Sequence, residues 1–96
     1  MKKEEIKSIV YKSLPMIKEK YHVKQVGIFG SVARGTEKND SDIDILVEFS
    51  SPIGFFDFMR LEKHLSEVLN KKVDLVSKKA IKPIIKKSIL DEVIYV

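Results

Sequence analysis

A glycine-serine pair followed closely by two aspartates is the part of this sequence whose residues could do chemistry. Gly30 and Ser31 open the run Gly-Ser-Val-Ala-Arg-Gly, and Asp42 and Asp44 follow in the run Ser-Asp-Ile-Asp. Glycine lets a backbone turn sharply and approach a ligand closely, and the N–H groups at a helix start attract anions. The first run therefore predicts a phosphate-binding turn, and the second predicts a metal-binding strand beside it.

Asp42 and Asp44 are separated by one residue, and alternate residues of a strand point to the same face of a sheet. Two ionised carboxylates on one face repel each other unless a cation lies between them. Oxygen ligands favour Mg²⁺ or Mn²⁺ over zinc, and Mg²⁺ is commonly held by one or two carboxylates together with substrate phosphates. The pair therefore predicts a divalent-cation site for a phosphate-bearing substrate.

A third carboxylate would complete such a site, and Asp74 is the first candidate because it lies between two apolar residues of a predicted strand. Glu48 shares the strand and the parity of Asp44 but lies farther along it. Asp57 falls in the first turn of a predicted helix, where an acidic residue stabilises the helix end. We rank Asp74 ahead of Glu48 and Glu48 ahead of Asp57.

Arg34 lies about one helical turn after Ser31, where it could bind a phosphate or pair with an acidic neighbour. Gly35 should end that turn in the left-handed conformation. Purely structural roles remain open for the residues taken singly, because Asp42 could cap a turn and Arg34 or a lysine could neutralise Asp44. Their occurrence together at this spacing favours a functional site.

Apolar periodicity defines the elements that must position these residues. It predicts helices over 4–20, 55–69 and from about Pro83 onward, and strands over 23–29, 42–49, 72–76 and 93–96. Pro15 should kink or restart the first helix, with Ser13 available as a cap, and Asn70 should end the second. The last helix should have an apolar face made by Ile81, Ile84, Ile85 and Ile89. The order indicates an α/β (α+β) fold with a small mixed β-sheet flanked by helices.

Composition limits the class of protein. The chain has 96 residues, 44% of them hydrophobic, a net charge of +4 and no cysteine. We expect one domain over residues 1–96, without disulfides or thiolate metal sites. No run approaches the roughly 20 apolar residues of a membrane span, and the N-terminus has no apolar signal region, so we expect a cytoplasmic protein. The lysines are dispersed, which favours a solvated surface over direct nucleic-acid binding.

Gly30-Ser31, ten further residues and Asp42-Ile43-Asp44 together resemble the signature of the DNA polymerase beta-like nucleotidyltransferase superfamily. Over nearly its whole length the chain looks like the minimal nucleotidyltransferase (MNT) branch. That branch includes the MntA-type antitoxins, which pair with HEPN-domain toxins. The resemblance implies a polymerase beta-like nucleotidyltransferase palm.

The resemblance also implies a mechanism. Asp42, Asp44 and Asp74 would be the catalytic ligands of two Mg²⁺ ions, with Mn²⁺ as a substitute, and Gly30 and Ser31 would bind the β- and γ-phosphates of ATP. A hydroxyl would attack the α-phosphorus and pyrophosphate would leave. In MntA-like members the acceptor is a tyrosine of the HEPN toxin. We therefore expect a protein adenylyltransferase acting as an antitoxin.

Two alternatives stay open at this point. One is a nucleotidyltransferase for a small-molecule or RNA hydroxyl, and the other is a non-catalytic toxin-binding module. The palm alone has little surface for an acceptor, so a partner or a second copy should supply it. The apolar candidates for contacting that partner are Ile53, Phe55, Phe56 and the tail 94–96. For Phe55 and Ile94, a place in the core or at a sheet edge is the favoured interpretation.

Overall fold

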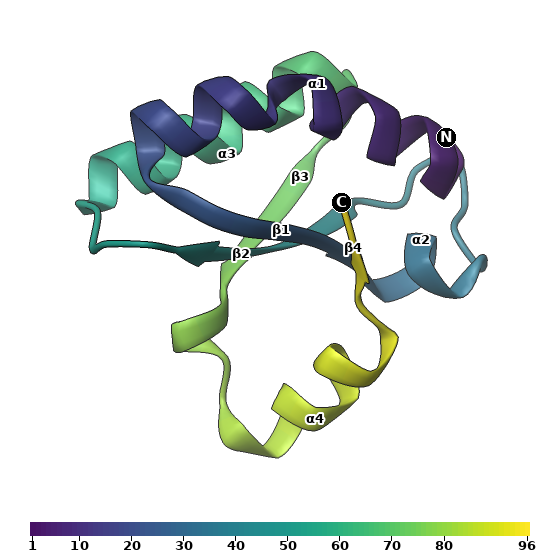
Figure 1. The fold of residues 1–96 in the computed structure, drawn as a ribbon. Helices are drawn as coiled ribbons and strands as arrows, with labels where there is room; N and C mark the ends of the chain where they lie inside the picture. Colours follow the sequence, from purple (N-terminus) through teal and green to yellow (C-terminus); the bar gives the residue numbers. More distant parts are fainter.

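Four short strands form one mixed sheet, with helices above and below it (Figure 1). The computed structural model describes all 96 residues. In chain order the elements are α1 (Lys3–Tyr21), β1 (Val23–Phe29), α2 (Gly30–Arg34), β2 (Ile43–Phe49), α3 (Phe55–Leu69), β3 (Val73–Ser77), the 3₁₀ turn η1 (Lys78–Ala80), α4 (Pro83–Glu92) and β4 (Ile94–Tyr95). The fold class and the element order expected from the sequence are confirmed.

The strand order across the sheet is β3-β2-β1-β4. Strand β1 pairs antiparallel with β2 and with β4, whereas β2 and β3 are parallel and joined through α3. The register places Asp44 opposite Phe29 on one side and opposite Asp74 on the other. Two acidic side chains on neighbouring strands therefore point to the same face of the sheet.

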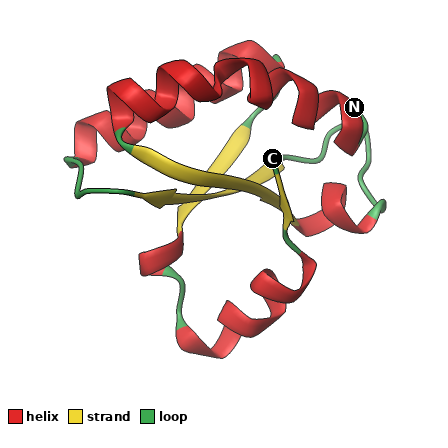
Figure 2. Cartoon of the chain, in the orientation of Figure 1, coloured by secondary structure: helices red, strands yellow, loops and turns green.

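The main core lies between the sheet and the pair of helices α1 and α3, which run side by side over one face (Figure 2). Helix periodicity brings one stripe of each helix onto the sheet, and the alternate residues of the strands meet it. The fully buried members include Ile6, Val10, Ile17, Ile28, Ile45, Leu61, Leu65 and Leu69. This layer holds the strands in register.

The opposite face of the sheet is covered over a smaller area. Phe29, Leu46 and Ile81 form a second cluster there, against which the C-terminal part of α4 packs. Leu46 is buried by this cluster while its neighbour Ile45 is buried in the main core. Because the cluster does not extend over the whole face, Asp44 is only half-buried and Asp74 is exposed.

The outer edge of β3 is closed by side chains of α3 rather than by another strand. The backbone N–H of Val73 donates to Ser66 Oγ at 3.1 Å, and that of Leu75 donates to Glu62 Oε2 at 2.9 Å. These bonds satisfy donors that an edge strand otherwise presents to solvent. They also fix α3 against the strand that carries Asp74.

The expectation that Pro15 restarts the first helix behind a Ser13 cap is wrong. Helix α1 runs from Lys3 to Tyr21 with Pro15 inside it. Proline removes one N–H and therefore one helical hydrogen bond, but Pro15 is exposed, so solvent can reach the carbonyl left without a donor. The buried residues on both sides of it keep the helix on the sheet.

The other helix ends predicted from glycine, asparagine and proline are confirmed. Gly35 ends α2 and Asn70 ends α3, both in the left-handed conformation, and Pro83 occupies the first turn of α4. No helix is both long and apolar enough to cross a membrane.

Two expectations about burial are wrong. Ile84 is 88% exposed and Ile85 is also exposed, because α4 contacts the sheet mainly through its C-terminal half. Phe55 is 71% exposed rather than part of the core, since it is the first residue of α3 and precedes the buried stripe of that helix. Its neighbour Phe56 is 72% exposed, so the two rings form an apolar surface patch.

Truncating the core between α3 and the sheet should destabilise the fold. Leu65→Ala removes a side chain that is 1% exposed, and the resulting cavity should lower the free energy of unfolding by about 2–5 kcal/mol. Val68→Ala on the exposed side of the same helix should cost less than about 1 kcal/mol. Urea unfolding followed by circular dichroism measures both, and equal losses would contradict this assignment of the core.

Candidate active site

Gly30 lies where β1 passes directly into α2, and its backbone has a φ of +75°. A Cβ atom on this residue would overlap with the carboxylate of Asp44, closest to Oδ2. Two separate constraints therefore require glycine here, since side chains disfavour this φ and the carboxylate fills the space. The phosphate-turn candidate and the metal-ligand candidate are thus in direct contact.

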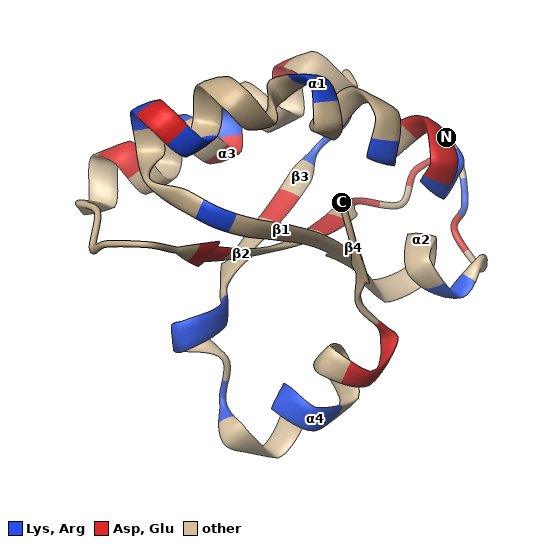
Figure 3. Ribbon diagram, viewed as in Figure 1, with Lys and Arg blue, Asp and Glu red and all other residues tan.

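The three predicted metal ligands lie at the amino-terminal ends of β2 and β3. Asp44 and Asp74 are register partners, and Asp42 immediately precedes β2. Figure 3 shows the acidic segments of the two strands side by side in the sheet. The side chains do not already converge into a closed group of three metal-binding acids, and Asp42 Oδ2 lies 3.6 Å from Lys72 Nζ.

The electrostatics of this cluster favour a bound cation. Burial raises the pKa of Asp44 above its ordinary value, and the nearby carboxylates of Asp74 and Asp42 raise the pKa further. The Arg34 guanidinium opposes this shift, but Glu92 adds to it. A divalent ion beside Asp44 would relieve the repulsion, and the oxygen donors are the kind that Mg²⁺ and Mn²⁺ prefer. The residues present therefore fit such an ion.

Arg34 pairs with an acidic neighbour, which is one of the two roles expected for it. Its Nη1 atom lies 3.0 Å from Glu92 Oε2 and 3.3 Å from Glu92 Oε1. The same carboxylate accepts a hydrogen bond from the Gly30 N–H at 3.0 Å. The sequence shows no sign of this role for Glu92, because nothing in the local pattern at the end of a short helix indicates a contact with residue 30.

The two lower-ranked acids lie apart from this cluster. Glu48 is four residues along β2 from Asp44, and its Oε1 atom lies 3.9 Å from Lys78 Nζ. Asp57 is on α3, with its Oδ1 atom 2.9 Å from Arg60 Nη1. Among the three candidates for a third carboxylate, only Asp74 is a register partner of Asp44.

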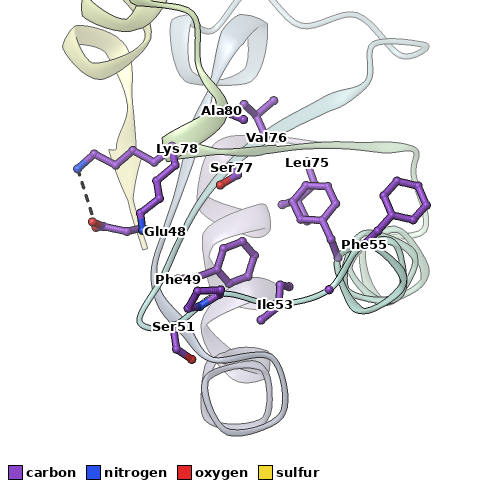
Figure 4. A pocket seen from close by; sticks show the side chains of 14 residues that line it. Glu48, Phe49, Ser51, Ile53, Phe55, Leu75, Val76, Ser77, Lys78 and Ala80 are labelled. Carbon is purple, nitrogen blue, oxygen red and sulfur yellow. Dashed lines mark ion pairs between the residues drawn. The ribbon is translucent and has the colours of Figure 1, made fainter.

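A cavity of about 620 Å³ lies at the opposite ends of the same strands (Figure 4). Apolar side chains from β2, the loop after it and α3 line most of its wall, among them Phe49, Ile53, Phe55 and Phe58. None of the three clustered aspartates lines it. The cavity is therefore separate from the acidic site and adjoins the exposed Phe55–Phe56 patch.

Comparison with known proteins identifies the class to which this fold and site belong. The sequence profile of the family described as "Nucleotidyltransferase domain" matches residues 10–96. The chain therefore belongs to the nucleotidyltransferase domain family, and it is a nucleotidyltransferase. This confirms the resemblance drawn from Gly30-Ser31 and Asp42-Ile43-Asp44.

Its similarities within that family include members of about the same length. A Methanocaldococcus jannaschii protein, provisionally assigned as a protein adenylyltransferase, is 54% identical over 93 residues, which cover 96% of this chain and 95% of the relative. The protein adenylyltransferase MntA of Thermococcus cleftensis is 43% identical over 93 residues, covering 97% and 94%. A solved structure described as a provisional minimal nucleotidyltransferase superposes with a TM-score of 0.84 at 33% identity, covering 98% and 95%.

More distant solved structures share the fold. A toxin–antitoxin structure with AMP-PNP matches with a TM-score of 0.75 at 22% identity, covering 88% of this chain and 69% of that chain. A complex of a tri-AMPylated Shewanella oneidensis HEPN toxin with an MNT antitoxin matches with a TM-score of 0.69 at 18% identity, covering 94% and 70%.

The contact between Gly30 and Asp44 can be tested with two glycines of the same backbone conformation. Gly30→Ala and Gly35→Ala both place a side chain at a φ of +75°, which should cost about 1–2 kcal/mol of stability in each. Only at position 30 does the new Cβ meet a carboxylate, since nothing lies within 4 Å at Gly35. Nucleotidyl transfer should therefore be lost in Gly30→Ala and retained in Gly35→Ala. Equal activity in the two variants would refute the role assigned to this contact.

The raised pKa of Asp44 predicts a pH dependence of stability. Between the ordinary value of 3.8 and the higher folded-state pKa, the folded protein binds the Asp44 proton more tightly than the unfolded chain does. The free energy of unfolding should therefore fall as pH rises through that window. The Asp44→Asn variant cannot ionise at this position, so it should be more stable than the wild type at neutral pH. The difference in stability should vanish at pH values below the ordinary pKa of 3.8, where Asp44 is protonated in both the folded and the unfolded wild type.

Urea titrations of the wild type and Asp44→Asn at a series of pH values measure this difference directly. Asp57→Asn, a surface acid paired with Arg60, serves as the control. If the wild type instead became more stable relative to Asp44→Asn as pH rises, the folded state would lower the pKa of Asp44 and this prediction would be wrong. Added Mg²⁺ should reduce the difference by stabilising the ionised form.

Proposed function

We propose that this nucleotidyltransferase is an antitoxin that transfers AMP from ATP to a tyrosine of a cognate HEPN toxin and thereby neutralises it. The observation that carries the proposal is the alignment of Asp44 with Asp74 in the sheet, directly against the Gly30 turn. This alignment supports a cation site beside a phosphate site. A nucleoside triphosphate needs both, because its phosphates carry several negative charges.

Asp42, Asp44 and Asp74 would hold Mg²⁺ or Mn²⁺. When bound, these ions neutralise the triphosphate and stabilise the oxygens that attack and leave the phosphorus. Burial and the neighbouring carboxylates both raise the pKa of Asp44, and the binding of these ions would compensate the repulsion among the three carboxylates. Asp42 Oδ2 lies 3.6 Å from Lys72 Nζ, and Asp42 would leave this ion pair in order to bind the metal ion.

The start of α2 would bind the phosphates. Ser31 offers a hydroxyl and a backbone N–H there, and Gly30 allows the chain to pass close to Asp44. Arg34 contacts Glu92 through Nη1, and its other N–H groups are donors for a phosphate oxygen. A bound triphosphate would then lie between Ser31 and Arg34 on α2 and the acids of β2 and β3.

The reaction forms one bond and breaks another at the α-phosphorus. The tyrosine oxygen of the toxin attacks that phosphorus, the bond to the β-phosphate oxygen breaks, and pyrophosphate leaves. The phenolic proton passes to a carboxylate at the open side of the site, where Asp74 is exposed. This chain contributes the alignment of acceptor and phosphate and a fixed charge arrangement, the two largest sources of acceleration in such transfers.

The proposed partner would complete the site by bringing the acceptor hydroxyl to it. The curated relatives are named as protein adenylyltransferases, and two fold relatives come from toxin–antitoxin structures. On this chain, Phe55 and Phe56 provide an exposed apolar patch of the kind that protein partners cover. The repeated occurrence of this fold beside HEPN toxins supports a protein acceptor over a small molecule or an RNA.

Labelled ATP tests the proposal with the full chain and its genomic neighbour co-expressed as the toxin partner. The partner should acquire the adenylyl label at tyrosine in the presence of Mg²⁺, as read by mass spectrometry. Asp42→Asn and Asp44→Asn should each reduce the rate by at least about 100-fold, whereas Asp57→Asn should leave it unchanged.

Three outcomes would overturn parts of the proposal. Unchanged transfer in Asp44→Asn would contradict the assignment of the metal site. Label found on RNA or on a small molecule would contradict the assignment of a protein acceptor. If a variant with all three aspartates changed to Asn still neutralised the toxin fully, neutralisation would depend on contact and not on catalysis.

A further inference from the structure

We propose that Glu92 is a positioning residue of the nucleotide site, holding Gly30 and Arg34 in place from the far end of the chain. This inference rests on the proposed function, since it assigns a role within the same site. Glu92 is the last residue of α4 and lies 62 positions from Gly30 in the sequence. Its carboxylate nevertheless contacts both ends of the short helix α2.

The two contacts fix different parts of the site. Oε1 accepts the Gly30 N–H at 3.0 Å, at the residue whose backbone touches Asp44. Oε2 lies 3.0 Å from Arg34 Nη1, one helical turn further on. One carboxylate therefore sets both the backbone at the start of α2 and the guanidinium at its end.

The distribution of donors decides which groups remain for a phosphate. A backbone N–H has one proton, so the Gly30 N–H is committed to Glu92. A guanidinium has five N–H donors, and the contacts with Glu92 use only Nη1 of Arg34. Glu92 would thus orient Arg34 and still leave N–H groups of the guanidinium available for a phosphate. The hydrogen-bond donors to phosphate would then be Ser31 and Arg34. Gly30 would instead allow the backbone to pass close to the Asp44 carboxylate.

The local setting gives no other reason for an acid at this position. A negative charge at the C-terminal end of a helix opposes the helix dipole, and Glu92 also lies close enough to Asp44 to disfavour its ionised form. Both effects are unfavourable, yet the side chain is only 25% exposed, and its hydrogen bonds and ion pair are with Gly30 and Arg34 of α2. A residue that breaks a local rule next to a functional site is expected to serve that site.

Binding of a non-hydrolysable ATP analogue with Mg²⁺ to the full chain tests the role. Glu92→Ala should weaken binding by about tenfold or more, because it frees both Gly30 and Arg34. Glu92→Gln should bind with intermediate affinity, since its amide oxygen can still accept the Gly30 N–H but no longer carries the charge that pairs with Arg34. The neighbouring Asp91→Ala removes only a surface pair with Lys87 and should bind like the wild type.

The readout separates positioning from a purely structural role. If Glu92 only stabilised the fold, Glu92→Ala would melt earlier but bind the analogue with wild-type affinity well below its melting temperature, and the proposal would be wrong. Tighter binding by Glu92→Ala would also overturn it, because Glu92 would then compete with phosphate. A wild-type protein that binds no nucleotide would instead overturn the proposed function.

Amide hydrogen exchange of the nucleotide-free protein gives an independent measurement. By NMR, the Gly30 amide should be protected in the wild type and in Glu92→Gln, and should exchange faster in Glu92→Ala. Equal protection of the Gly30 amide in all three proteins would show that the contact with Glu92 does not hold α2 in place. The positioning role would then be wrong, whatever the affinities of the variants for the ATP analogue.

Discussion

The pairing register of β2 is the constraint on which the site depends. With Asp44 opposite Phe29 and Asp74, its carboxylate lies beside the next acid and against the Gly30 backbone. A slip of one residue would turn Asp44 into the main core and bring Ile45 to the site face. The burial of Ile43, Ile45 and Val47 against α1 and α3 prevents that slip. Packing on one face therefore determines chemistry on the other.

The same arrangement explains why the two faces of the sheet differ. The face under α1 and α3 is fully buried, and it supplies the stability that a half-buried carboxylate beside two others reduces. The face under α4 is covered only around Leu46, Phe29 and Ile81, which leaves Asp44 half-buried and Asp74 exposed. Glu92 joins this lightly packed helix to α2, so the C-terminal segment contacts the candidate site as well as covering the sheet.

Residue types with strong local preferences made much of this predictable. Apolar periodicity identified β1 and α3 with their observed bounds, and Gly35 and Asn70 ended their helices in the expected conformation. The spacing of Asp42 and Asp44 predicted acids on one face, and parallel pairing with β3 brings Asp74 beside them. These features follow from alternation and backbone sterics, which a sequence records directly.

Long-range contacts explain what the sequence did not reveal. Glu92 meets Gly30 only because α4 folds back across the sheet, and no local pattern encodes that meeting. Ile84 and Phe55 have the hydrophobicity of core residues, but each lies on a part of its helix that reaches beyond the packed layer. Pro15 does not interrupt α1, because the tertiary packing of the helix outweighs one lost hydrogen bond.

The hydrogen bonds from Val73 and Leu75 to Ser66 and Glu62 have a further consequence for association. Strand addition at an open sheet edge is a common and weakly selective way for chains to join. Here the outward-facing N–H groups of Val73 and Leu75 are already occupied, so a strand added at this part of β3 would have to displace two side chains of α3. The amino-terminal part of β3, which carries Asp74, is thereby protected from strand addition, because its two outward N–H groups are bound within the molecule.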